Sequence, residues 1–128
     1  MKAVILAAGM GTRLGKYTEN KPKCMLEFNG KPLLEWQVDT LRRAGVDGIS
    51  VVRGYRKENI GIGGVKYYEN PDYASTNMVS TLMCARREFN DDLLVCYSDI
   101  LYERRVVEAA VGTDCALGVV VDCDYQDY

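Results

Sequence analysis

The sequence predicts an α/β domain built around a mostly parallel sheet. The 128-residue chain has room for one domain and not for two. It opens on a continuous apolar run, Lys2–Ala8, which is typical of a strand buried on both faces. Strand-length apolar runs then alternate with helix-length segments, and this alternation favours parallel strands joined by helical crossovers.

Local signals support each element in the first half of the chain. Gly9–Lys23 is rich in Gly, Thr, Asn and Lys, so we expect a long loop there with a short helical turn. A helix is predicted over Pro32–Ala44, because Pro32 suits a first turn and Gly45 suits a C-terminal cap. The next apolar run, Gly48–Arg53, predicts the second strand.

The second half continues the same alternation to a fifth strand. A buried parallel strand needs both faces covered, and no helix follows this last one. We therefore expect residues 1–128 to be the first part of a larger domain. The remaining predicted elements are a strand over Val65–Glu69, a helix over Asn77–Phe89, a strand over Asp92–Ser98, a helix over Glu103–Val111 and a strand over Cys115–Val121.

Composition excludes several classes of function. The chain has 16 Lys and Arg against 18 Asp and Glu, so it lacks the overall basic charge that nucleic acids or anionic membranes attract. No apolar run approaches a membrane span, and the N-terminus does not resemble a signal peptide, so we expect a cytoplasmic protein. Histidine is absent, which excludes Cys/His zinc sites and nucleophiles activated by His. The five cysteines form no C-x-x-C pair, and we expect most of them, including Cys96 and Cys115, to be buried and reduced.

The strongest functional signal is the glycine loop Leu6–Leu14, followed by Lys21-Pro22-Lys23. Glycines let successive backbone N–H groups approach an anion closely, and Arg13 and Lys23 add positive charge for phosphate oxygens. The alternative is a tight turn with solvated cations. The loop does not match the P-loop pattern, and Leu14 stands where a dinucleotide-binding fingerprint needs its third glycine.

The string L-A-A-G-x-G-x-R-L with a trailing K-P-K resembles the nucleotidyltransferase superfamily, whose members activate sugar phosphates and alcohol phosphates with NTPs. The resemblance implies a Rossmann-like three-layer α/β/α sandwich, similar to that of the A-type glycosyltransferases. It also implies that residues 1–128 are the N-terminal, nucleotide-binding part of the domain, and that a second metal-binding aspartate lies beyond them.

The same resemblance implies roles for individual residues. Arg13 would hold the β- and γ-phosphates of the NTP, and Lys23 would lie against the α-phosphate and stabilise charge that grows there. Asp99 matches the magnesium-binding aspartate. The residues of the strand end and loop that would cradle the NTP are Leu6, Ala7, Ala8, Gly9, Gly11 and Thr12.

The position of Asp99 supports its role independently. It follows an apolar strand, and ligands of open parallel sheets bind beyond the carboxyl ends of the strands, where the glycine loop also leaves. The alternative is that Asp99 caps the following helix. Asp91 and Asp92 begin the same strand and therefore lie at the opposite edge.

Polar residues at a predicted helix start offer a second candidate region. Asn77, Ser80 and Thr81 would contribute to recognition of the base, with ordinary N-capping by Asn77 as the alternative. Tyr55 could stack on a base or be an ordinary surface residue.

Three further stretches resemble cytidylyltransferases of the phosphocholine or aminoethylphosphonate type: Thr18–Asn20, Lys31–Glu35 and Asn77–Leu82. They imply magnesium-dependent transfer of CMP from CTP to a small phosphate or phosphonate, with release of pyrophosphate. The acidic and aromatic tail, Asp122–Tyr128, suits an ammonium group on that acceptor. The alternatives are a sugar-1-phosphate nucleotidylyltransferase and a non-catalytic nucleotide-sensing module.

Overall fold

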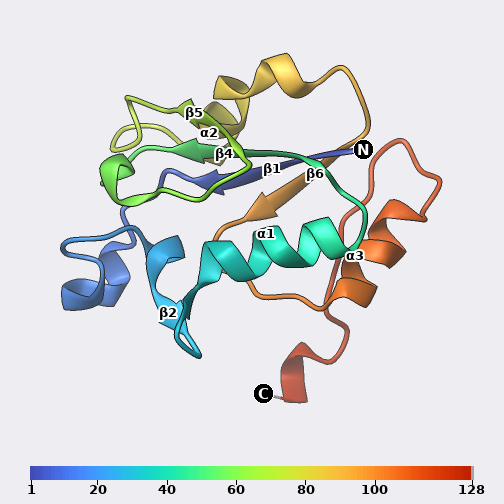
Figure 1. Ribbon diagram of the computed structural model, residues 1–128, viewed down its shortest axis with the longest axis horizontal. Coiled ribbons are helices and arrows are strands. Elements are labelled where there is room, and N and C mark those ends of the chain that lie inside the picture. The colour runs from blue at the N-terminus through green and yellow to red at the C-terminus, as the bar shows by residue number, and fades with distance from the viewer. Residues whose placement is uncertain (128) are drawn as a thin grey trace.

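Four parallel strands form the central sheet of the protein, described here over residues 1–127 of a computed structural model (Figure 1). Their spatial order is β5–β4–β1–β6, so β1 pairs on both sides and β6 lies at an edge. The predicted α/β class with a parallel sheet is confirmed. The strands are β1 (Lys2–Ala7), β4 (Gly48–Arg53), β5 (Lys66–Glu69) and β6 (Leu93–Tyr97).

Helices cover both faces of this sheet and give it three layers. α1 (Leu33–Arg43) and α3 (Arg104–Val111) lie on one face, and α2 (Met78–Cys84) lies on the other (Figure 1). This arrangement confirms the expected α/β/α sandwich. None of the helices in the described part of the chain has the length and apolar character needed to cross a membrane.

Strand β1 is buried on both faces, which explains its unbroken apolar sequence. Ala3 and Ile5 pack into the core under α1 and α3, whereas Val4 and Leu6 pack on the α2 side. Successive side chains of a strand point to opposite faces, so a strand with helices on both sides needs apolar residues at every position.

The helices end close to their predicted bounds, with one exception. α1 ends before Gly45, whose φ of 86° is the left-handed conformation expected after a helix. The helix predicted over Asn77–Phe89 stops at Cys84 and continues as a tight 3-10 turn over Arg86–Glu88. This tightened end brings Glu88 against the sheet, where it meets cationic partners.

A short hairpin precedes α1 and was absent from our sequence prediction. β2 (Glu27–Phe28) and β3 (Lys31–Pro32) pair in an antiparallel manner around Asn29 and Gly30, both at positive φ. Asn-Gly is the strongest two-residue signal for such a turn, so the sequence did contain the information.

The prediction of a fifth strand over Cys115–Val121 is wrong. The segment is irregular and exposed, with Leu117 89% and Val119 81% accessible to solvent. A strand forms only when its backbone groups find a partner strand, and no strand in residues 1–127 pairs with this segment. Cys115 is consequently exposed instead of buried.

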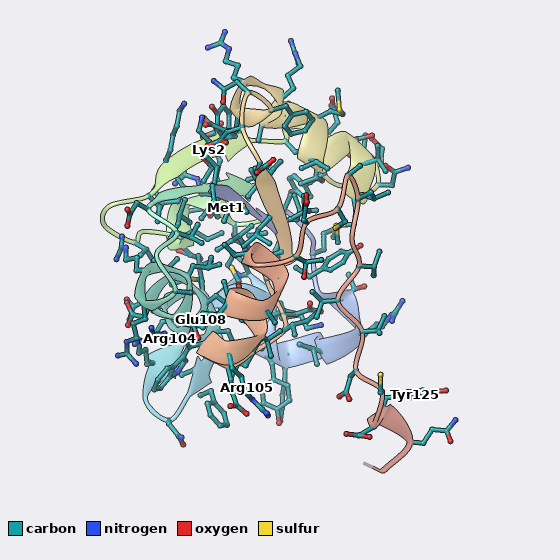
Figure 2. The ribbon with its side chains drawn as sticks, turned by 90° about the vertical axis from the view of Figure 1, so that its right-hand side faces the viewer. Met1, Lys2, Arg104, Arg105, Glu108 and Tyr125 are labelled. Atoms are coloured by element: carbon teal, nitrogen blue, oxygen red, sulfur yellow. The ribbon has the colours of Figure 1, made fainter. Side chains whose placement is uncertain are left out.

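The prediction that most of the cysteines are buried is also wrong, because their burial follows the local packing of each segment. Cys24 is buried, Cys84 and Cys96 are half-buried, and Cys123 is exposed; all are free. The tail ends in a 3-10 turn over Tyr125–Asp127, and Figure 2 shows Tyr125 well away from the sheet. Tyr128, which we assigned to the possible ammonium site, lies outside the described residues.

A buried carboxylate joins the end of the α2 region to two strands. Glu88 is only 6% exposed, and its oxygens lie 2.9 Å from Lys2 Nζ and 2.5 Å from Lys66 Nζ. The Tyr68 hydroxyl donates a third hydrogen bond to it. The bonds from Lys66, Tyr68 and Lys2 lower the pKa of Glu88 from 4.5 to about 2. Figure 2 shows Lys2 at this amino-terminal end of β1.

We expect Glu88→Gln to lower the free energy of unfolding by on the order of 2 kcal/mol at pH 7, because an amide N–H2 would face ammonium donors. A carboxyl whose pKa is lowered by folding stabilises the protein above its unfolded pKa. The contribution of Glu88 is therefore lost as the pH falls from 4.5 to about 2. Urea unfolding at both ends of this range measures it.

The matched control is Glu69→Gln, which breaks the exposed ion pairs of Glu69 with Lys57 and Arg53. Its effect should be clearly smaller than that of Glu88→Gln, because solvent screens exposed ion pairs. Equal losses from the two substitutions would contradict a special role for Glu88.

Candidate functional site

Two of the predicted site residues, Lys23 and Asp99, meet where the carboxyl ends of β1 and β6 lie side by side. The two strands pair in parallel with Leu6 beside Tyr97, so the loops that follow them leave side by side. Lys23 Nζ lies 2.6 Å from Asp99 Oδ2, with the two side chains 39% and 37% exposed. The structure therefore pairs the predicted phosphate-binding lysine with the predicted metal-binding aspartate.

Asp99 does not cap the helix that follows it, which was the alternative explanation for this residue. The N-cap position of α3 belongs to Glu103, and no side-chain hydrogen bond caps that helix. The carboxylate of Asp99 instead faces Lys23 across the edge of the sheet.

The glycine loop combines a buried base with an exposed backbone. Leu6, Ala7 and Ala8 contribute their side chains to the core, whereas Gly9 is exposed at the edge of the sheet. Gly11 has a φ of 62°, and a Cβ there would lie 3.1 Å from Thr18 Cγ2, so both conformation and space favour glycine.

Thr12 and Arg13 follow in an exposed 3-10 turn, Thr12–Tyr17. Arg13 is therefore accessible to an anion from solution.

Two side chains that the sequence did not identify as structural hold this loop in place. Thr18 Oγ1 donates a hydrogen bond of 2.7 Å to the Gly11 carbonyl. The Tyr55 hydroxyl lies 2.9 Å from the Thr18 carbonyl and 2.8 Å from the Glu19 carbonyl, and its single proton can serve either. Tyr55 is thus a restraint on the loop in this structure, and its ring packs edge-on against Tyr73.

Gly54 allows the close approach that puts Tyr55 there. A Cβ at Gly54 would lie 2.9 Å from the Ala8 carbonyl oxygen and 2.8 Å from Tyr73 Cβ, distances that real side chains do not tolerate. The next residue, Tyr55, donates its backbone N–H to the same Ala8 carbonyl at 3.1 Å. The ends of β1 and β4 are therefore joined directly below the glycine loop.

The polar residues of α2 are engaged mainly with each other. Asn77 Oδ1 accepts a hydrogen bond from the Ser80 N–H at 3.1 Å, so the N-capping alternative is realised. Thr81 is buried; its hydroxyl accepts from Asn70 Nδ2 at 3.0 Å and lies 3.2 Å from the Asn77 carbonyl. A role of Asn77, Ser80 and Thr81 in base recognition stays a prediction.

A surface hollow of about 390 Å³ lies on the Tyr55 side of the loop. Its lining includes Thr12 and Thr18 but neither Lys23 nor Asp99. We place the site at the Lys23–Asp99 contact because charge and the topology of the sheet both point there, and a concave shape alone does not.

Comparison with known proteins identifies the family of the chain. Residues 3–122 match the MobA-like NTP transferase domain family. The chain belongs to this family. The predicted resemblance to NTP-dependent nucleotidyltransferases is thereby confirmed.

Similar proteins include cytidylyltransferases with small phosphorylated acceptors. The CTP:phosphoglutamine cytidylyltransferase of Campylobacter jejuni is 36% identical over an alignment of 133 positions, which covers 95% of this chain and 53% of that protein. The choline-phosphate cytidylyltransferase of Streptococcus pneumoniae is 36% identical over 107 residues, covering 80% of this chain and 47% of that protein.

A solved structure of the Streptococcus pneumoniae CTP:phosphocholine cytidylyltransferase superposes with a TM-score of 0.74 at 34% identity. The match covers 81% of this chain and 49% of that structure. The NTP transferase chain described here thus spans about half the length of the curated relatives that it matches.

We expect Tyr55→Phe to loosen residues 12–19 without unfolding the protein, because it removes the hydroxyl proton that is shared between two loop carbonyls. The loss should be about 1 kcal/mol. Backbone ¹⁵N relaxation should show lower order in the loop and unchanged order in the sheet. Tyr73→Phe removes a hydroxyl from the neighbouring ring and is the control. If both variants keep an equally ordered loop, the Tyr55 hydroxyl is not its restraint.

Proposed function

We propose that the protein is a magnesium-dependent nucleotidyltransferase that moves CMP from CTP to a small phosphate or phosphonate and releases pyrophosphate. The observation that carries the proposal is the contact between Lys23 and Asp99 beside the glycine loop, at the edge where open parallel sheets bind ligands. The choice of CTP rests on the named activities of the similar cytidylyltransferases.

The proposed reaction needs little covalent chemistry from the protein. A phosphate or phosphonate oxygen of the acceptor attacks the α-phosphorus of the NTP in line, and the bond to the pyrophosphate leaving group breaks. Because the attacking oxygen is already anionic, no protein base or nucleophile is required. Catalysis then depends on positioning and on stabilising negative charge in the transition state.

The chain offers candidate groups for such catalysis. Lys23 would stabilise charge on the α-phosphate, and the exposed Arg13 would bind the β- and γ-phosphates. The backbone around Gly9 and Gly11 would approach the phosphates closely. In this structure, Lys23 and Asp99 neutralise each other's charge. With substrates bound, the phosphates would neutralise Lys23 and a cation would neutralise Asp99.

Asp99 is the residue that would hold magnesium. Mg²⁺ is commonly bound by one or two carboxylates together with substrate phosphates, and a half-exposed aspartate at the sheet edge fits that pattern. Within residues 1–127, side chains form no cluster of three or more candidate metal ligands, so the nucleotide would supply further oxygens. When bound, the ion would neutralise phosphate charge.

The proposal includes a cytoplasmic location and small-molecule partners only. The net charge of −2 supports the choice of partners, because the chain has no overall basic charge to attract a polyanion.

The test is a panel of CTP, UTP, GTP and dTTP with phosphocholine, aminoethylphosphonate and glucose-1-phosphate, followed by pyrophosphate release from the full-length protein. Turnover with CTP and an amino-alcohol phosphate or phosphonate supports the proposal. Turnover only with the sugar phosphate assigns the protein to the sugar-nucleotide enzymes. Nucleotide binding without turnover would indicate a sensing module.

We expect Lys23→Ala to lower kcat by roughly 10²–10³, the effect of removing one preorganised charge from a transition state. The side chain is half-exposed, so the fold should persist. Pyrophosphate release and circular dichroism measure the two effects. Lys21→Ala, two residues away and exposed, is the matched control. Near wild-type turnover of Lys23→Ala would contradict its assignment.

We expect Asp99→Asn to raise the magnesium concentration needed for half-maximal activity, because a hard divalent cation prefers a charged carboxylate to a neutral amide. High magnesium should restore part of the lost rate. A magnesium titration of pyrophosphate release measures this shift. Asp92→Asn, at the opposite end of the same strand, should leave the titration unchanged. Identical magnesium curves for wild type and Asp99→Asn would remove Asp99 from the metal site.

A further inference from the structure

Gln37 is a buried polar residue on the apolar face of α1. It is 1% exposed and lies among Leu34, Val38 and Leu41, which form the core beneath the sheet. Burying a primary amide is unfavourable unless its polar atoms are hydrogen-bonded. The partners of Gln37 therefore indicate why an amide stands at a position that suits a leucine.

Both donors of the Gln37 amide bind the segment that carries Asp99. Nε2 donates to the Tyr97 carbonyl at 2.8 Å and also to the Ile100 carbonyl. These two carbonyls bracket Asp99 in the chain. Oε1 is buried without a hydrogen-bond partner among the described residues. The site therefore uses the donor side of the amide and leaves its acceptor side unused.

We propose that Gln37 is the positioning residue for Asp99. This inference rests on the proposed function. One uncharged nitrogen with two N–H groups closes the chain from Tyr97 to Ile100 into a fixed turn, and that turn directs the Asp99 carboxylate toward Lys23. α1 thus controls the geometry of Asp99 through the backbone carbonyls on either side of it.

Few other side chains could perform this task. Methionine fills a similar volume but donates no hydrogen bond, and glutamate would place an anionic oxygen against two carbonyl oxygens. Asparagine keeps both donors but is shorter by one methylene. Without Gln37, the carbonyls of Tyr97 and Ile100 lose these two part-buried hydrogen bonds, and the turn between them relaxes. A displacement of about 1 Å in a reacting site can cost 10²-fold in rate.

The first measurement is independent of activity and uses backbone ¹⁵N relaxation of the full-length protein. Gln37→Met should lower the order parameters of residues 98–100 from about 0.85 toward 0.6, with the sheet unchanged. Thr40→Val is the matched control, because it removes one hydrogen bond from the same helix, between Thr40 Oγ1 and the Trp36 carbonyl. Unchanged order at residues 98–100 overturns the proposal.

The second measurement is a double-mutant cycle with Asp99. Gln37→Met should lower kcat by roughly 10–10²-fold and raise the magnesium requirement, with little change in the KM for CTP. In the Asp99→Asn background, the same substitution should change kcat by less than about threefold. Effects that multiply would show that Gln37 acts without Asp99, and this result also overturns the proposal.

Two further outcomes are possible: the variant does not fold, or the proposed function fails. If Gln37→Met does not fold, Gln37→Asn takes its place in both measurements, with losses of the same kind expected. If the wild-type protein transfers no nucleotide to any acceptor, the proposed function fails. The order parameters at residues 98–100 then decide alone whether Gln37 holds the turn.

Discussion

The pairing of β1 with a parallel strand on each side is the constraint on which the rest of the structure depends. Because β1 is central and covered on both faces, its position is set by hydrogen bonds to β4 and β6 and by packing with helices above and below. Its carboxyl end cannot shift without disturbing all of these contacts. The loop that follows therefore leaves a rigid base.

The site is assembled from loops that single side chains hold by their carbonyl groups. Thr18 donates to the Gly11 carbonyl of the glycine loop, and Tyr55 meets the carbonyls of Thr18 and Glu19 in the segment that follows it. Gln37 binds the carbonyls on both sides of Asp99. Such bonds restrain the backbone and leave the outer surface of a loop free for a ligand. In this way an irregular segment can hold one defined backbone conformation although it is exposed.

Charged groups lie at both ends of the parallel strands, here called the amino edge and the carboxyl edge of the sheet. At the amino edge, Glu88 is buried and its charge is satisfied by Lys2 and Lys66, an arrangement that serves stability. At the carboxyl edge, Lys23 and Asp99 meet at 2.6 Å but remain partly exposed. Exposed charges can exchange a protein partner for a phosphate or a cation, and this property suits the carboxyl edge to chemistry.

The sequence by itself determined the class of the fold, the family and the residues of the glycine loop. The continuous apolar run of strand β1 and the cap at Gly45 are local signals, and the motif ending in Lys23 is a contiguous string, so no distant contact is needed to read them. The tertiary structure alone decided which distant residues meet. Gln37 and Asp99 are 62 positions apart by number, and nothing in either neighbourhood shows that α1 would hold that turn. The unformed strand over Cys115–Val121 has the same cause: its residues favour a strand, but a strand exists only where a partner lies beside it.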